Sequence, residues 1–418
     1  MDRNSFAVVS TPQFWTALVL LLVLALLPLG RSSEAGIAIG AMGGLVLAWR
    51  ERKSLWRNRG VRLAALVFAC YWLAALISAP GAIAPDKSWS TVAVLLRFPP
   101  FVLFACLTLR DAAVWPRMLA GIGMLVVLWL LDAWVQIFTG YSLAGATDAA
   151  RLSGIFGADN LKLGPVLAVM SPFVFAAARA RFGWRGLVVA FVFQLTPILF
   201  AGSRSAWLMY ALVTLVFAWR QTRAPLRFLA WSAGAGCLVA AAAVVALHDS
   251  SAFDARWQRS LLALQGSEQA LDEAAAGRVR IWGTAARMIA AHPIVGVGVR
   301  GFRNAYPQFA LPGDTFVDAA TGDGAAHAHQ IVLEVLSETG VIGLILWIAG
   351  AIAAIGAWRR AGPRARERAF APGVALATMC FPLNTHLAFY SAWWGLLFWW
   401  LLALYCAALG AGDDRDDA

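Results

Sequence analysis

Apolar stretches of about 20 residues recur along the whole chain, and this feature limits the fold more than any other. A helix of that length spans the hydrocarbon core of a bilayer. A polar stretch longer than about 30 residues occurs once, which excludes a large soluble domain. Hydrophobic residues make up 61% of the chain and charged ones 14%, against about a quarter charged in soluble domains. We therefore expect an all-α integral membrane protein.

Hydropathy predicts about twelve transmembrane helices. The stretches are roughly 12–30, 35–49, 63–79, 89–109, 117–138, 161–178, 186–203, 204–219, 228–248, 330–358, 369–386 and 390–410. The first stretch is too long for the apolar region of a typical signal peptide and lacks a clear cleavage site. We interpret it as a retained span.

Basic residues gather in alternate short loops, at 50–62, 110–117, 179–185, 220–227 and 359–368. The loops between them hold few Lys or Arg, which predicts that both termini and the basic loops are cytoplasmic. This pattern explains the net charge of +11 better than nucleic-acid binding does. Three parts follow: transmembrane helices one to nine (1–248), a periplasmic loop domain (249–328) and helices ten to twelve (329–418).

The long loop has one clear helical signal, in "RVRIWGTAARMIAAHPIVGVGVRGF" (278–302). Apolar and small residues repeat there with a helical period, at Ile281, Thr284, Ala285, Met288 and Ile289. His292-Pro293 and the glycines at 296 and 298 are expected to end this helix. We predict short helices within the loop.

Two of the five histidines, His327 and His329, lie together where the tenth span begins. Imidazole accepts a proton near neutral pH, so either ring is a candidate general base. The alternative is a polar residue that only marks a helix end. A zinc site would need three or four ligands, and no third His or Cys is near in the sequence. Glu334 and Glu338 follow as residues that either orient a base or serve the structure, because carboxylates at this depth need partners.

Outer arginines supply candidate anion ligands. Arg204 lies in "FAGSRSAWL" (200–208) at a tight hairpin, and Arg278 and Arg280 begin the loop helix on different faces. A guanidinium group binds two phosphate oxygens at once, and two arginines can bind one pyrophosphate in this way. The alternatives are contact with lipid headgroups or with solvent. Further possible substrate contacts are Arg151, Lys162 and Arg300.

Metal and disulfide chemistry have little support. The five cysteines all lie in apolar stretches and are odd in number. Carboxylates are scarce in the outer segments, and no D-x-D pair occurs there. A metal-dependent transferase would usually need such carboxylates. We expect a reaction without metal or cofactor, in which arginines stabilise the developing charge.

The order of motifs resembles the O-antigen ligase/polymerase superfamily of bacterial envelope glycosyltransferases. The chain has many spans, then "SRSAW", then the loop with "GRVRIW…HPIVGVGVRGF" and its closing "AHQIVLEVLSETGVIG". The closing segment is similar to the family signature H-N-x-x-L-x-x-x-x-E-x-G-x-x-G, with Gln330 in place of Asn. The resemblance implies that His329 is the catalytic base and that its neighbour His327 is a further possible substrate contact. It also implies that Arg204 and Arg278 bind the substrate pyrophosphate, with Arg280 as the fallback for Arg278.

What the resemblance implies is a metal-independent, inverting O-antigen ligase of the bacterial inner membrane, with its site on the periplasmic face. The donor would be a polysaccharide on undecaprenyl pyrophosphate and the acceptor a sugar hydroxyl of lipid A–core. An O-antigen polymerase, a protein O-oligosaccharyltransferase and, less in keeping with the residues, a lipid-linked glycan transporter are the alternatives. The glycan, the acceptor sugar and the oligomeric state are left open.

Overall fold

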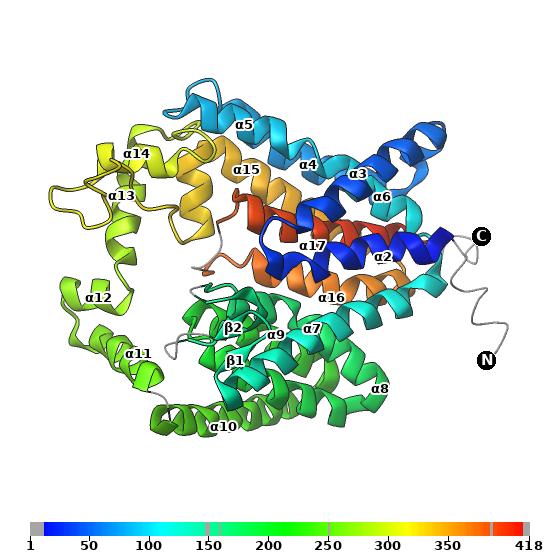
Figure 1. Cartoon of the computed structure of the whole chain (residues 1–418). Coiled ribbons are helices and arrows are strands. Elements are labelled where there is room, and N and C mark those ends of the chain that lie inside the picture. Colours follow the sequence, from blue (N-terminus) through cyan, green and yellow to red (C-terminus); the bar gives the residue numbers. More distant parts are fainter. Residues whose placement is uncertain (1–11, 147–150, 159, 250, 385–387, 413–418) are drawn as a thin grey trace. The chain divides into compact units, whose positions relative to one another are not determined.

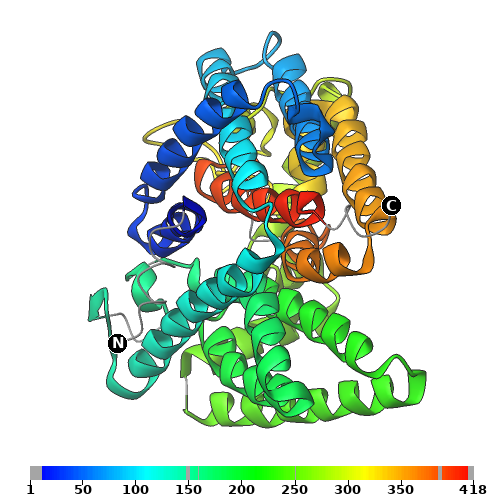
Figure 2. The same cartoon turned by 90° about the vertical axis from the view of Figure 1, so that its right-hand side faces the viewer.

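The structure, a computed structural model, describes residues 12–146, 151–158, 160–249, 251–384 and 388–412. Helices make up nearly all of the ribbon, beside one two-stranded hairpin (Figure 1). The view turned by 90° in Figure 2 shows the same helical ribbon. The expected all-α class is confirmed. The expected cytoplasmic termini lie outside the described residues.

The elements follow the apolar stretches closely. Before the long loop they are α2 Pro12–Ala25, η1 Leu27–Leu29, α3 Ser33–Arg50, η2 Leu55–Arg57, α4 Arg59–Ser78, α5 Pro85–Leu95, α6 Phe98–Thr108, η3 Ala112–Val114, α7 Trp115–Thr139, β1 Tyr141–Ser142, β2 Gly145–Ala146, η4 Gly154–Phe156, α8 Leu163–Phe200, α9 Arg204–Thr222 and α10 Pro225–Asp249. After it begins they are α11 Ser251–Leu261, η5 Leu262–Gln265, α12 Glu268–Ala274, α13 Arg278–Ala291, α14 Phe302–Phe309, α15 Ile331–Arg360, α16 Pro363–Met379 and α17 Ala392–Gly410.

Seven helical segments among the described residues are long and apolar enough to cross a membrane. They are Arg59–Ser78, Pro85–Thr108, Ala112–Thr139, Leu163–Phe200, Pro225–Val244, Ile331–Arg360 and Ala392–Gly410. The chain is therefore a multi-pass membrane protein by the length and composition of its helices. Each expected stretch falls on a helix or a pair of helices over its described residues, and the number of twelve crossings stays a prediction.

Helix α8 is two arms joined at Gly183, which has φ 61° and ψ −145°. The rings of Phe175 and Phe191 lie 5.9 Å and 5.7 Å from the ring of Tyr210. A straight helix would separate those two phenylalanines by about 24 Å along its axis. The chain therefore folds back at Gly183, in agreement with two separate stretches at 161–178 and 186–203.

The stretch predicted at 89–109 lies in the candidate span Pro85–Thr108, which consists of two helices, α5 and α6. Pro99 and Pro100 lack the N–H groups that would continue α5, so the chain starts a new helix at Phe98. Arg97 occupies the break, and its Nη2 donates to Glu34 Oε1 of α3 at 2.9 Å. A charged side chain inside an apolar stretch thus has a structural partner.

The chain forms two compact units, residues 1–115, 277–370 and 385–418 in the first and 116–276 and 371–384 in the second. In the first unit α4 packs against α15 and α17. Tyr71 is central there: its hydroxyl donates to the carbonyl of Phe389 at 3.0 Å, and its ring lies 5.3 Å from that of Trp399. In the second unit α7 holds the chain that follows it, because Asp132 Oδ1 accepts from Leu143 N at 2.7 Å.

Candidate active site

Helix α13 lies where the sequence predicts an amphipathic helix. The residues it buries are Ile281, Thr284, Ala285 and Met288, and they pack with Phe302 and Tyr306 of α14 and with Ala325 and Ala328. Ile289, also expected on this face, is half-buried. The loop between α12 and α15 therefore has a small hydrophobic core of its own.

A buried polar network stiffens that core. The Tyr306 hydroxyl donates to Asp314 Oδ2 at 2.8 Å. Burial is the main cause that raises the pKa of Tyr306, so the phenol keeps the proton that it donates. Arg287 Nη2 donates to Thr284 Oγ1 at 2.8 Å, and its Nε donates to the carbonyl of Phe309 at 2.6 Å. Thr284 lies on the predicted buried face, whereas Tyr306, Asp314 and Arg287 belong to no motif, so the sequence does not single them out.

The two candidate histidines lie against each other. The ring centroids of His327 and His329 are 3.9 Å apart, and both side chains are half-buried. Between them, the carbonyl of Ala328 accepts from Trp282 Nε1 at 3.1 Å. Trp282 belongs to α13, so this hydrogen bond ties the loop helix to the histidine segment.

His329 has the left-handed backbone conformation, with φ 53°. For a residue with a Cβ this conformation costs about 1–3 kcal/mol unless its surroundings impose it. Gln330 follows as the N-cap of α15, and its Oε1 accepts from Leu333 N at 2.5 Å. This is the bond that an N-cap Asn would make, so Gln fulfils the same role at this position. The expected helix start at Gln330 is observed.

Both glutamates of α15 are bound to backbone N–H groups. Glu338 is 2% exposed, and its Oε2 accepts from Arg300 N at 2.8 Å, with a longer bond of 3.4 Å from Phe302 N to Oε1. Glu334 is fully buried, and its Oε1 accepts from Tyr390 N at 3.3 Å. These bonds support the structural alternative for both carboxylates. They hold the segments before α14 and before α17 against the start of α15.

The chain after α13 is bonded directly to a break in α15. Gly340 interrupts that helix with φ 64° and ψ −166°. Val297 N donates to Ser337 O at 2.8 Å, Gly298 N to Glu338 O at 3.0 Å, and Val341 N to Pro293 O at 2.9 Å. The approach leaves no room for side chains, since a Cβ on Gly296 would lie 2.4 Å from the carbonyl carbon of Glu338. The glycines of "GVGVRGF" thus serve close backbone packing.

The arginines of the first unit differ in their surroundings. Arg278 is half-buried and lies four residues before Trp282, on the same face of α13. Arg280 is exposed, and its Nη1 donates to Thr315 Oγ1 at 3.1 Å. Arg300 has φ 60°, and its positive charge acts on both Glu334 and Glu338. The arrangement favours Arg278 over Arg280 as the arginine that faces the histidines.

Arg204, Arg151 and Lys162 belong to the second unit. Arg204 begins α9, and its Nη1 donates to Ser260 Oγ at 3.2 Å and to the carbonyl of Ala274, at the end of α12. Its Nε and Nη2 make no hydrogen bond within the part of the chain that the structure describes. One edge of the guanidinium thus keeps two parallel N–H donors for an anion. Arg151 is exposed, while burial lowers the pKa of Lys162.

A comparison with protein families found a match over part of the chain. Residues 189–348, less than half of the chain, match the family model described as O-Antigen ligase. Over these residues the chain is similar to the O-antigen ligase family. The matched region runs from the second arm of α8 into α15, so it contains Arg204, α13 and the two histidines. The match supports a glycosyltransferase-like membrane enzyme that acts on lipid-linked glycans. A comparison with curated proteins found no match.

We predict that Gly340→Ala weakens the packing around the break in α15. The new Cβ would lie 2.2 Å from the carbonyl oxygen of Ile294, and the alanine would have to adopt the positive φ of Gly340. We expect the free energy of unfolding to fall by about 2 kcal/mol or more. Thermal unfolding in one detergent measures the change. Gly350→Ala in the same helix is the control: its nearest neighbour would be Cys70 Cβ at 3.6 Å, so equal losses would contradict the role of the break.

Proposed function

We propose that the protein transfers a glycan from a polyprenyl pyrophosphate to a sugar hydroxyl of lipid A–core, as an O-antigen ligase. The observation that carries this proposal is the hydrogen bond from Trp282 Nε1 to Ala328 O at 3.1 Å. It holds the histidine pair against the face of α13 that begins with Arg278, one helical turn away. In the proposal, His329 is the base and Arg278 is the phosphate ligand, and this bond supports their pairing.

In the proposed reaction His329 takes the proton of the acceptor hydroxyl. The acceptor oxygen forms a bond to the anomeric carbon while the bond from that carbon to the pyrophosphate oxygen breaks. The proton remains on the imidazole, and the electron pair leaves with the pyrophosphate. General base catalysis of this kind is worth about 10²–10⁴-fold. The strained backbone of His329 supports this role, because such strain concentrates at functional sites.

Arg278 matches the charge that develops on the leaving pyrophosphate. It stands at the first position of α13, where the free N–H groups of a helix end also favour an anion. The sequence predicts Arg204 for the same pyrophosphate, and its unused Nε–Nη2 edge suits a phosphate. Direct attack by the acceptor inverts the anomeric centre, and the two glutamates that could act as nucleophiles are buried and accept hydrogen bonds from backbone N–H groups.

A carrier for lipid-linked glycans is the alternative from a different class. Carriers place ionisable residues and broken helices at mid-membrane, around the transported molecule. Arg97 and Asp132, the main ionisable residues inside the predicted spans, bond Glu34 and the backbone of Leu143. These structural partners favour the enzyme over the carrier.

We predict that His329→Gly separates catalysis from stability. Glycine adopts the left-handed conformation without strain, so the melting temperature should stay equal or rise. Loss of the base should lower the transfer rate by about 10²–10⁴-fold. Thermal unfolding and transfer to lipid A–core are measured on the same preparation. Transfer at the parent rate would reject His329 as the base.

Arg278→Gln and Arg280→Gln form a matched pair on one helix. We expect Arg278→Gln to lower kcat/KM by about 10²–10³-fold, because it removes charge stabilisation at the leaving group. Arg280→Gln should stay within a few-fold of the parent, because that side chain is exposed and bonds Thr315. Initial rates over a range of donor concentrations measure both values. The reverse ranking would assign Arg280 to the pyrophosphate.

A competition between acceptors tests the reaction itself. Purified protein receives one labelled polyprenyl-pyrophosphate glycan together with lipid A–core, a second lipid-linked glycan and a pilin-like protein. We expect the label on lipid A–core, with the His329→Gly variant as the inactive control. Label on the second lipid-linked glycan would identify a polymerase, and label on the protein an oligosaccharyltransferase.

A further inference from the structure

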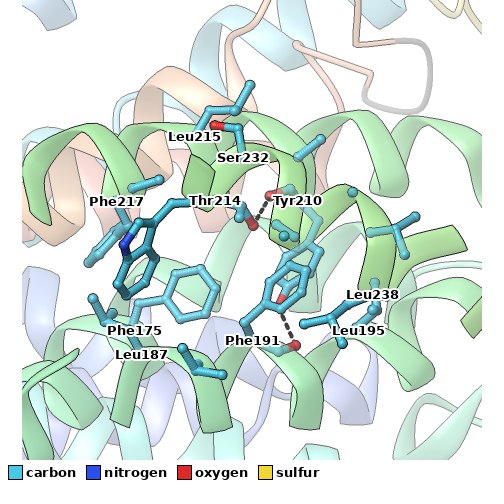
Figure 3. A pocket seen from close by; sticks show the side chains of 18 of the residues that line it. Phe175, Leu187, Phe191, Leu195, Tyr210, Thr214, Leu215, Phe217, Ser232 and Leu238 are labelled. Atoms are coloured by element: carbon cyan, nitrogen blue, oxygen red, sulfur yellow. Dashed lines mark hydrogen bonds between the residues drawn. The ribbon is translucent and has the colours of Figure 1, made fainter. Parts of the chain in front are cut away.

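An apolar cavity of about 660 Å³ lies within the second unit, between the two arms of α8, α9 and α10. Its walls are aromatic and aliphatic side chains, among them Phe175, Phe191 and Tyr210 (Figure 3). The polar groups of Tyr210 and Thr214 are turned to backbone carbonyls, at Phe191 O and Tyr210 O. A space of this size with such walls suits an apolar ligand.

Helix α10 leaves one side of the cavity open. Its mean hydropathy is that of a membrane span, yet none of that window is buried by the rest of the chain. The wall that α10 contributes includes Gly234 and Gly236, and a Cβ added at either glycine would meet nothing within 4 Å. The small residues therefore keep space free rather than allow close helix packing. We call this open space the α10 groove.

One end of the α10 groove is basic and aromatic. The rings of Trp184 and Trp231, both in its wall, meet edge to face at 6.2 Å, and the guanidinium of Arg185 lies 5.6 Å from the Trp184 ring. The turn at Gly183 and the link between α9 and α10 bring further arginines to this end: Arg179, Arg181, Arg220, Arg223 and Arg227. No Asp or Glu occurs between residues 160 and 248. Tryptophan beside a group of arginines is typical of the headgroup level of a bilayer.

Ser232 adds a polar group inside the groove wall. Its hydroxyl oxygen is buried and has no hydrogen-bond partner within the described part of the chain. Ser232 lies five residues after Arg227 on α10, so it is about 7.5 Å farther along the helix axis than that arginine. A hydroxyl at that depth is placed to donate to an ester carbonyl below a headgroup.

We propose that the α10 groove binds an anionic glycerophospholipid. An acyl chain fills the apolar cavity, Ser232 donates to an ester carbonyl, and the arginines around Arg185 bind the phosphate. Charge complementarity decides the headgroup, since each arginine near a membrane surface favours anionic lipid. By the positive-inside rule this basic end faces the cytoplasm, whereas the candidate active site is predicted on the outer face. The bound lipid is therefore distinct from the glycan donor.

Gly236→Leu tests the groove directly. Leucine fills open space and improves the helix, so the variant should fold. The protein is reconstituted in phosphatidylcholine vesicles with and without phosphatidylglycerol, extracted, and examined by native mass spectrometry for retained lipid. We expect retained phosphatidylglycerol to fall at least about tenfold, because two excluded methylenes already account for that factor. Ala233→Leu, exposed on the same helix and outside the groove wall, should behave like the parent.

A second variant, Arg185→Gln with Arg227→Gln, tests the headgroup. It should lower the preference for phosphatidylglycerol over phosphatidylcholine by about fivefold or more. Unchanged phosphatidylglycerol retention in Gly236→Leu would overturn the proposal. So would equal loss of both lipids in the arginine variant. A purified protein that instead carries a polyprenyl phosphate, lost only in Gly236→Leu, would assign the groove to an isoprenoid chain and overturn it as well.

Discussion

The exchange of backbone hydrogen bonds between residues 293–298 and the break in α15 is the interaction on which the site depends. A helix that breaks at membrane depth leaves N–H and carbonyl groups that no water satisfies. Here the chain after α13 supplies the partners, with bonds from Val297 N to Ser337 O and from Val341 N to Pro293 O. The same bonds fix the far end of α13. The same hydrogen bonds therefore supply partners for the backbone of the broken helix and hold the loop helix in place.

The candidate base is positioned through this arrangement rather than by a carboxylate beside it. Glu338 accepts from Arg300 N, which secures the loop, and Trp282 of α13 then bonds the carbonyl between the two histidines. The left-handed His329 is followed at once by the Gln330 cap. Because bonds before and after His329 hold the chain, the strain of its backbone is offset locally. The imidazole is thereby presented at the start of α15.

Much of this organisation could be predicted from the sequence, and the remainder could not for physical reasons. Hydropathy located the helices, and the helical period located the buried face of α13, because both signals repeat over many residues. The break at Gly340 and its partner glycines 296 and 298 are single residues, and their meaning depends on which backbone approaches them. The bond from Trp282 to Ala328 joins residues 46 apart in the chain, which no local pattern records. The roles of the two glutamates were open for the same reason.

Arginine shows why residue type alone does not identify a site in such a chain. Arg97 forms an ion pair with Glu34, and Arg280 bonds a loop hydroxyl. Arg185 stacks on a tryptophan at the basic end of the α10 groove. An arginine suited to bind phosphate differs from these three. The fold holds its guanidinium in place, but one edge of the group makes no hydrogen bond to the described part of the chain. Arg204 meets that condition, because the bonds of Nη1 to α11 and α12 fix its plane while Nε and Nη2 stay available. A guanidinium held in this way loses little freedom when an anion arrives, so its fixed plane favours binding.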